Sequence, residues 1–152
     1  MIQRRQSIFL LAVLILSVLL YTGPLAFIST GDGGYYLKHS GAVDLNGEKL
    51  DFTTWPLTVM ISISVLLSFV TLFSYMKRPR QIRLALFQMF FNLGLIGVAF
   101  YYVLYIMHNY GGEQFVFQWR VVIPPIMLVL LILAIRDIRK DELLVKAYDR
   151  LR

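Results

Sequence analysis

Two amide side chains, Gln88 and Asn92, lie four residues apart inside a long apolar stretch of the chain. On a helix this spacing puts both amides on the same face. A second apolar stretch carries hydroxyls at Ser64, Ser68 and Thr71, which also share one helical face. Polar groups in such surroundings either hydrogen-bond between neighbouring helices or contact a neutral solute or quinone. We expect helix packing, with the hydroxyls as partners of the amides, and keep the binding of a neutral or lipidic small molecule as the alternative.

Other side chains with catalytic or ligating chemistry are few. The chain has no cysteine, which excludes disulfides, thiolate metal sites and thiol redox reactions. Its two histidines, His39 and His108, lie in a loop and at the end of an apolar stretch, so they cannot form a paired set of haem or metal ligands inside a membrane. We therefore predict no catalytic residue, no cofactor and no metal site, and we expect the protein not to be an enzyme.

Four apolar runs position these polar residues, and each is long enough to cross a bilayer, whose core about 30 Å thick requires about 20 helical residues. None of the runs contains Asp, Glu or Lys, and the only Arg inside them is Arg120. The pattern predicts an all-α membrane protein with a single domain over residues 1–152, an antiparallel bundle of four transmembrane helices. The runs cover residues 7–28, 55–76, 84–107 and 115–135.

Lys and Arg are distributed unevenly between the two sides of this bundle. Twelve of the 15 lie before the first run, between the second and third, or after the fourth. The positive-inside rule therefore places both termini in the cytoplasm. The net charge of +6 gathers where lipid headgroups lie, so it indicates membrane lipids as partners and no nucleic acid. The residues assigned to headgroup contact or topology are Arg4, Arg5, Lys77, Arg78, Arg80, Arg83, Arg139, Lys140, Lys146 and Arg150.

The one sizeable loop, residues 29–54, is predicted to lie on the outer, periplasmic side. Asn46-Gly47 is typical of a type I′ turn, which predicts a small β-hairpin around it, with Asp44 opposite Lys49. A hairpin of this size is only marginally stable alone, so its apolar face must pack on the rim of the bundle or on a partner. That face consists of Val43, Leu45, Leu50 and Phe52.

The charged tail, residues 136–152, contains no Gly or Pro, so the fourth helix is expected to continue into the cytoplasm as an amphipathic helix. Leu144, Tyr148 and Leu151 lie on one face of it. An interfacial helix on anionic lipid explains this stripe, and docking of a cytoplasmic partner is the alternative. The possible partner surface therefore comprises Leu144, Tyr148 and Leu151 in the tail, and Val43, Leu45 and Leu50 in the outer loop.

Prolines and aromatic residues mark the outer ends of the runs. The first helix is expected to end or bend at Gly23-Pro24, and the fourth to kink or begin near Pro124, whose ring clashes with the carbonyl of Arg120. Arg120 either anchors its span at the outer interface or pairs with an acid such as Glu113 or Asp51. An interfacial aromatic belt is predicted from Trp55, Tyr101, Tyr102, Tyr105, Tyr110, Phe117 and Trp119.

The two ends of the chain carry a family resemblance. Residues 1–7, together with residues 138–152, resemble an uncharacterised family of small four-span membrane proteins from Bacteroidetes-type bacteria, known only as a domain of unknown function. The closing motif is the more specific of the two, and the resemblance covers the whole chain. It implies a bacterial inner membrane, and it brings no activity, cofactor or catalytic residue with it.

These observations predict a non-enzymatic integral protein of the inner membrane, an accessory or scaffold subunit that acts through helix packing and contact with partners or lipids. Its expected partners are membrane lipids and either other membrane proteins or further copies of itself. Ion and proton transport normally need an ionisable group at membrane depth, and the four runs lack one. The alternative is a binder or carrier of a neutral or lipidic molecule within the bundle.

Overall fold

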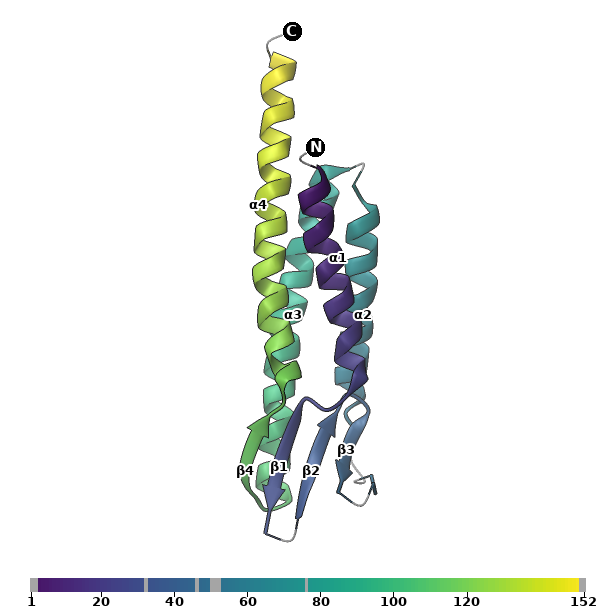
Figure 1. Cartoon of the computed structure of the whole chain (residues 1–152), viewed down its shortest axis with the longest axis vertical. Coiled ribbons are helices and arrows are strands. Elements are labelled where there is room, and N and C mark those ends of the chain that lie inside the picture. The colour runs from purple at the N-terminus through teal and green to yellow at the C-terminus, as the bar shows by residue number, and fades with distance from the viewer. Residues whose placement is uncertain (1–2, 32, 46, 50–52, 76, 151–152) are drawn as a thin grey trace.

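The structure, a computed structural model, describes residues 3–31, 33–45, 47–49, 53–75 and 77–150. Four helices lie side by side along the long axis, and a small β-sheet covers one end of them (Figure 1). Both termini and the turn between the second and third helices lie at the opposite end. The helices are α1 (Gln3–Leu19), α2 (Trp55–Phe73), α3 (Arg78–Asn109) and α4 (Ile123–Arg150), with short 3-10 helices η1 (Leu20–Thr22) and η2 (Trp119–Val122).

Prolines set where the helices begin. Pro56 and Pro79 each stand in the first turn of their helix, where a missing N–H costs nothing. Pro124 and Pro125 likewise occupy the first turn of α4, which begins at Ile123 after η2. The fourth helix therefore starts afresh at this point, one of the two outcomes predicted from the proline. It then continues to Arg150, as expected for the tail.

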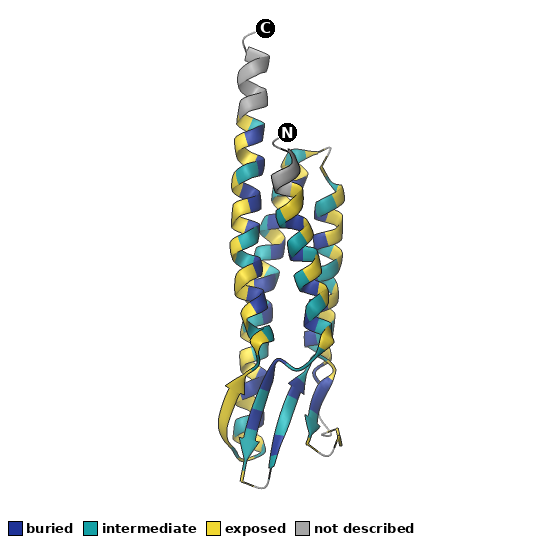
Figure 2. Cartoon of the chain, viewed as in Figure 1, coloured by how far each residue is buried: buried dark blue, intermediate teal, exposed yellow. Residues whose placement is uncertain are grey.

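The helices pack in a ring in which α1 and α3 each contact both α2 and α4. Their outward faces are strongly apolar: Phe90 of α3 is 72% exposed and Leu66 of α2 is 63% exposed. The polar side chains Ser17, Gln88 and Asn92 are instead buried between the helices, the reverse of a water-soluble protein. Figure 2 shows this arrangement along the four helices.

Three segments are long and apolar enough to cross a membrane: Trp55–Phe73, Arg78–Asn109 and Trp119–Leu143. The apolar part of α1, Ser7–Thr22, is shorter. Among the described residues, length and composition thus identify three candidate spans.

The sheet is antiparallel, with strand order β3-β2-β1-β4. Ile28 in the central strand lies opposite Tyr35 on one side and Phe115 on the other. Because the last strand lies between α3 and α4 in the sequence, the sheet joins both loops at this end, and it packs against the end of α3. The strands are β1 (Ala26–Thr30), β2 (Gly33–Lys38), β3 (Gly41–Asp44) and β4 (Gly112–Phe117).

This sheet corrects the sequence prediction in two places. Residues 26–28 and 115–117, assigned to the first and fourth membrane spans, belong to strands β1 and β4. Apolar strand residues next to an apolar helix look like a continuation of that helix by hydropathy alone. The chain is mostly helical, as predicted, but the described residues contain a four-stranded sheet where one hairpin was expected.

The register of the predicted hairpin is also wrong by one residue. Lys49 bridges to Val43, and not to Asp44. The N–H of Gly47 donates to the carbonyl of Asp44 (2.9 Å), and Gly47 takes a left-handed φ of 86°. A left-handed glycine after the turn is the arrangement of a three-residue loop with a bulge, which shifts the pairing by one position. Residues 46 and 50–52 lie outside the described residues.

Candidate functional site

The buried hydroxyls and an amide meet at one level inside the four helices. Nε2 of Gln88 on α3 donates to Oγ of Ser68 on α2, and Nε2 also lies 3.4 Å from the carbonyl oxygen of Ser64. Oγ of Ser17 on α1 lies 3.2 Å from the same Ser68 oxygen and 4.0 Å from the sulfur of Met127 on α4. Side chains from three helices therefore meet at Ser68, and Met127 of the fourth helix joins them through Ser17.

Asn92 makes a second hydrogen bond between helices, one helical turn closer to the sheet than Gln88. Its Nδ2 donates to the carbonyl of Pro124 on α4 (2.8 Å), so it does not bond an α2 hydroxyl as predicted. The buried face of α2 that carries Ser68 and Ser64 extends toward the start of the helix through Ile61 and Leu57, which are apolar and fully buried. Asn92 therefore uses a backbone carbonyl of the neighbouring helix α4 as its acceptor.

Toward the end away from the sheet, two further contacts hold α3 to its neighbours. Nε2 of Gln81 donates to the carbonyl of Thr71 (3.1 Å), and Nη1 of Arg78 donates to the carbonyl of Asp141 on α4 (3.0 Å). Sequence reasoning placed Thr71 at a helix contact, but it missed Gln81 and Ser17. The signal for Ser17 was its hydroxyl, the one polar side chain in the apolar run of residues 8–20.

Four buried polar atoms of this core have no hydrogen-bond partner among the described residues: Oε1 of Gln88, Oδ1 of Asn92, Oγ of Ser64 and Oγ1 of Thr71. Amide oxygens are strong acceptors, and a buried acceptor without a donor is costly. An internal water or a donor group on a bound molecule can satisfy them. The core can therefore both hold helices together and accept a small neutral donor.

Arg120 ties the helices to the sheet end. Its Nε donates to Oγ1 of Thr22 (3.3 Å), and its guanidinium carbon lies 4.6 Å from the ring centre of Trp119. It also covers Gly23, where a Cβ would come within 2.7 Å of that carbon. The sequence predicted Glu113 or Asp51 as a possible acidic partner of Arg120. Among the described residues, the contacts of Arg120 are with Thr22, Gly23 and Trp119 and not with Glu113, and Asp51 lies outside that part of the chain.

The predicted aromatic belt surrounds the same end. Trp55, Tyr101 and Trp119 are all more than half exposed, whereas Tyr102 is buried. Tyr110 packs edge-on against Tyr35 of the sheet, with ring centres 5.9 Å apart. Among the described residues, no group of three or more His, Cys, Asp or Glu is arranged to hold a metal ion.

His39 fastens the sheet to α2. Its carbonyl accepts hydrogen bonds from the hydroxyls of Thr54 (2.9 Å) and Thr58 (2.7 Å), and its ring packs edge-on to Tyr21 at 5.0 Å. Burial lowers the pKa of His39 from its ordinary value, and the positive charge of Lys38 lowers it further. The folded protein thus favours the neutral imidazole.

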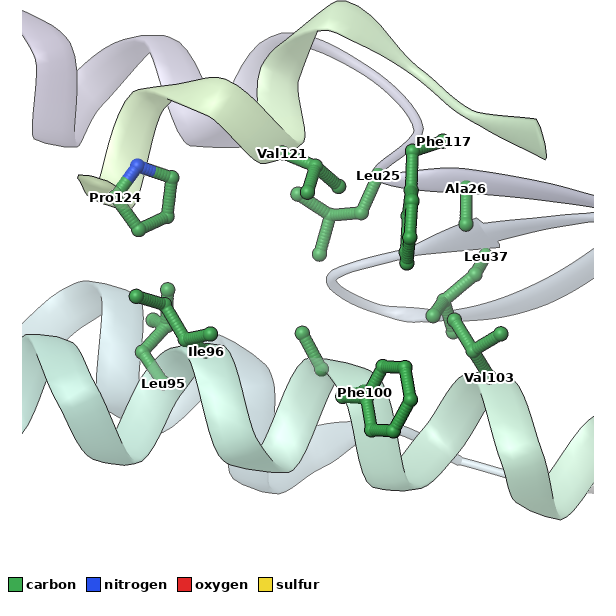
Figure 3. Close-up of a pocket in the computed structure, with 11 residues that line it drawn as sticks. Leu25, Ala26, Leu37, Leu95, Ile96, Phe100, Val103, Phe117, Val121 and Pro124 are labelled. Carbon is green, nitrogen blue, oxygen red and sulfur yellow. The ribbon is translucent and has the colours of Figure 1, made fainter. Parts of the chain in front are cut away.

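An apolar cavity lies between the sheet and α3 (Figure 3). Its volume is about 70 Å³, which is several times what one water needs. Phe100 and Val103 of α3 face Phe117, Leu25 and the start of α4 across it. Every side chain that lines it is a hydrocarbon, so it suits an alkyl group. The lining residues are Leu25, Ala26, Leu37, Leu95, Ile96, Ala99, Phe100, Val103, Phe117, Val121 and Pro124.

The basic residues assigned to lipid headgroups belong to the start of α1, the turn between α2 and α3 with the start of α3, and the later part of α4, and these segments lie at the end away from the sheet (Figure 1). Arg78 is half-buried there, and the side chains that are exposed are Lys77, Arg80, Arg83, Arg139 and Lys140. On the predicted partner surface Val43 is half-buried and Leu45 is 56% exposed. Leu144, Tyr148, Lys146 and Arg150 belong to α4. Leu50 and Leu151 lie outside the described residues.

The sequence profile of one protein family, described as Domain of unknown function (DUF4293), matches residues 2–151. The chain belongs to this family. The match covers nearly the whole chain and confirms, at that level, the resemblance to an uncharacterised family seen in its two ends. A comparison with curated proteins found no match.

The lowered pKa of His39 predicts a pH-dependent stability. In the unfolded chain histidine titrates near about 6.5, so the unfolded state binds more protons than the folded state just below that pH. The contribution of His39 to stability should therefore be complete well above that pH and be lost progressively as the pH falls below it. Thermal unfolding in detergent at several pH values measures this. His39→Gln should flatten the profile, whereas His108→Gln, at an exposed site, should not; equal profiles for all three proteins would contradict it.

The convergence on Ser68 predicts an unequal response of two serines on the same helix. Ser68→Ala removes the acceptor of Gln88 and the neighbour of Ser17, and should destabilise the protein by about 1–2 kcal/mol. The hydroxyl of Ser74 bonds the carbonyl of Val70 within α2 (2.6 Å), so Ser74→Ala should cost less than about 0.5 kcal/mol. Titration with a denaturing detergent measures the free energy of unfolding of both variants. Equal losses of stability would show that the contacts of Ser68 contribute no more than those of Ser74.

Proposed function

We propose that this protein is an integral protein of a bacterial inner membrane that crosses the bilayer four times. We further propose that it serves as a non-enzymatic accessory or scaffold subunit. The observation that carries the proposal is the reversed polarity of the helices. Large apolar side chains such as Phe90 and Leu66 point outward, and the amide of Gln88 is fully buried. Lipid is the solvent that favours this distribution.

The proposal includes α1 as a membrane span. Its apolar part is shorter than the other three, but the helix packs along both α2 and α4 and is extended by η1 as far as Thr22. Its outward side chains Ile8, Leu11 and Ile15 are exposed and apolar, like those of the longer helices. Ser17 then reaches the polar core from the fourth side.

The orientation follows from charge. The end that holds both termini also holds the exposed basic cluster, so this end lies in the cytoplasm and the sheet lies outside. The exposed indoles of Trp55 and Trp119 and the phenol of Tyr101 lie near the sheet, where the outer interface would be. Arg120 would extend its guanidinium toward the same interface.

A scaffold role is supported by how the buried polar groups are used. The donors of Gln88, Asn92, Gln81 and Arg78 all serve contacts between helices. The outer sheet leaves two edge strands, β3 and β4, and exposed apolar side chains at Leu45 and Val116. Such edges and patches are the usual sites where a partner chain attaches.

Single-cysteine labelling tests the membrane topology, because the natural chain has no cysteine and supplies an unlabelled background. In spheroplasts, an impermeant maleimide should label Ser40→Cys, at the sheet end. It should label Lys77→Cys and Ser7→Cys only after the membrane is opened. All three are exposed positions. Labelling of Ser7→Cys from outside would show that α1 does not cross.

The apolar cavity favours a second candidate function, the binding of a lipidic small molecule. Its wall of Phe100, Phe117 and Val103 can surround an alkyl group at the level of the aromatic belt. The unpartnered oxygens of Gln88 and Asn92 lie deeper and would suit a molecule that also carries a hydrogen-bond donor.

Purification in a mild detergent followed by mass spectrometry separates the two functions. The scaffold role predicts a protein partner, or a second copy, at fixed ratio. That partner should be lost from the double variant Leu45→Lys/Val116→Lys, which charges the exposed apolar side chains of both edges, and kept by Ser40→Lys, which adds a charge at an exposed turn. The second candidate predicts instead a bound small molecule, lost when Ala99→Phe fills the cavity. A chain that carries neither would contradict both.

A further inference from the structure

A groove runs between α3 and α4 at the end away from the sheet, with a volume of about 500 Å³. Its floor is apolar: Leu86 and Met89 come from α3, and Ile132 and Ile135 from α4. Ile132 is 51% exposed, so the floor is open to the surroundings of the protein. In the proposed membrane these surroundings are lipid.

Three cations line the outer part of the same groove. Arg136, Arg139 and Lys140 are spaced by three and four residues along α4, so they form one stripe, and all three are exposed. Asp141 lies on a different face of α4, buried against α3, where its carbonyl accepts from Arg78. Asp137 and Glu142 also lie on this part of α4, and none of the three acids is among the described residues that line the groove.

The order of these residues along α4 matches the order of groups in a phospholipid. The chain runs away from the sheet, so Ile132 and Ile135 lie deeper and the three cations nearer the end of the helices (Figure 1). Acyl chains occupy the apolar layer and phosphates lie at its surface. Basic pockets between helices on the cytoplasmic side have the chemistry that binds anionic headgroups.

We propose that this groove is a binding site for an anionic glycerophospholipid. Its acyl chains lie on the floor formed by Leu86, Met89 and Ile132, and its phosphate lies among Arg136, Arg139 and Lys140. The proposal rests on the membrane orientation given under the proposed function. A zwitterionic lipid carries an amine that the three cations repel, so an anionic lipid is preferred, and one with two phosphates most of all.

The basic cluster at the α2–α3 turn provides a matched control. Lys77, Arg80 and Arg83 carry the same charge at the same end of the molecule and are exposed. The hollow beside them is smaller, about 180 Å³, and Phe73 is the one large apolar side chain among the described residues that line it. This cluster therefore attracts anionic lipid to the surface without an apolar floor that holds acyl chains.

Native mass spectrometry of the full chain, released from nanodiscs of mixed phosphatidylglycerol, cardiolipin and phosphatidylethanolamine, tests the site. Each basic residue near a membrane surface contributes about fivefold to anionic lipid binding. The triple variant R136Q/R139Q/K140Q should therefore retain at least about tenfold less anionic lipid than the natural chain. The control K77Q/R80Q/R83Q also removes three charges near the surface, but lipid held by charge alone is lost when the chain leaves the nanodisc, so the retained anionic lipid should fall by less than about threefold. Glycerol phosphate, which has the phosphate without acyl chains, should not compete.

A second variant separates the groove from simple charge attraction. The double variant Ile132→Trp/Leu86→Trp fills the floor of the groove with larger apolar side chains and keeps all three cations. It should still weaken binding of the anionic lipids. Equal losses in the two charge variants, or no loss on filling the floor, would overturn the proposed site. Labelling of the cysteine positions is independent of this result, so loss of the lipid site would leave the proposed topology standing.

Discussion

Apolar helices whose outer surfaces are as apolar as their surroundings gain little from exclusion of water, so polar contacts between them decide how they pack. In this protein that role falls on Ser68. It accepts from Gln88 of α3, lies beside Ser17 of α1, and stands at the level of Met127 of α4. Small side chains at Ser17 and Ser64 allow the helices to approach closely there. The contacts of Asn92 and Gln81 are placed relative to this level, because these residues lie one turn and two turns from Gln88 along α3, on opposite sides of it.

The sheet end is fixed to the helices by backbone acceptors and one cation. The carbonyl of His39 receives two hydroxyls from the start of α2, and Arg120 links η2 to η1 across Gly23. Strand β4 brings the loop between α3 and α4 into the same sheet as the first loop. Sheet and helices therefore form one unit, and the surface that the sheet presents is held in a defined orientation relative to the helices.

The helical part of this structure could be predicted in large measure from the sequence. Apolar periodicity located the helices, the proline at 124 located the start of α4, and the spacing of Gln88 and Ser68 indicated a contact between α2 and α3. The strands could not be separated from the helices in the same way. Ile28 and Phe115 are apolar and next to apolar helices, and they pair with each other across a long sequence separation. Hydropathy is local and has no term for such pairing. The partner of Asn92 was missed for a similar reason, because a backbone carbonyl leaves no trace in the sequence.

The uneven lengths of the helices connect the fold to its proposed setting. Helix α4 has 28 residues and is about 42 Å long, which exceeds a bilayer core of about 30 Å. Its first turns join the sheet, so the excess must lie at the other end, where α4 extends beyond its neighbours (Figure 1). A helix that leaves the hydrocarbon must change from apolar to charged residues at that depth, and α4 does so between Ile135 and Arg136. The cations thus stand where lipid phosphates would lie, beside a groove that α3 completes. Lipid binding and membrane orientation would then both depend on one feature of the sequence, the position along α4 at which a charged helical turn follows the last apolar turn.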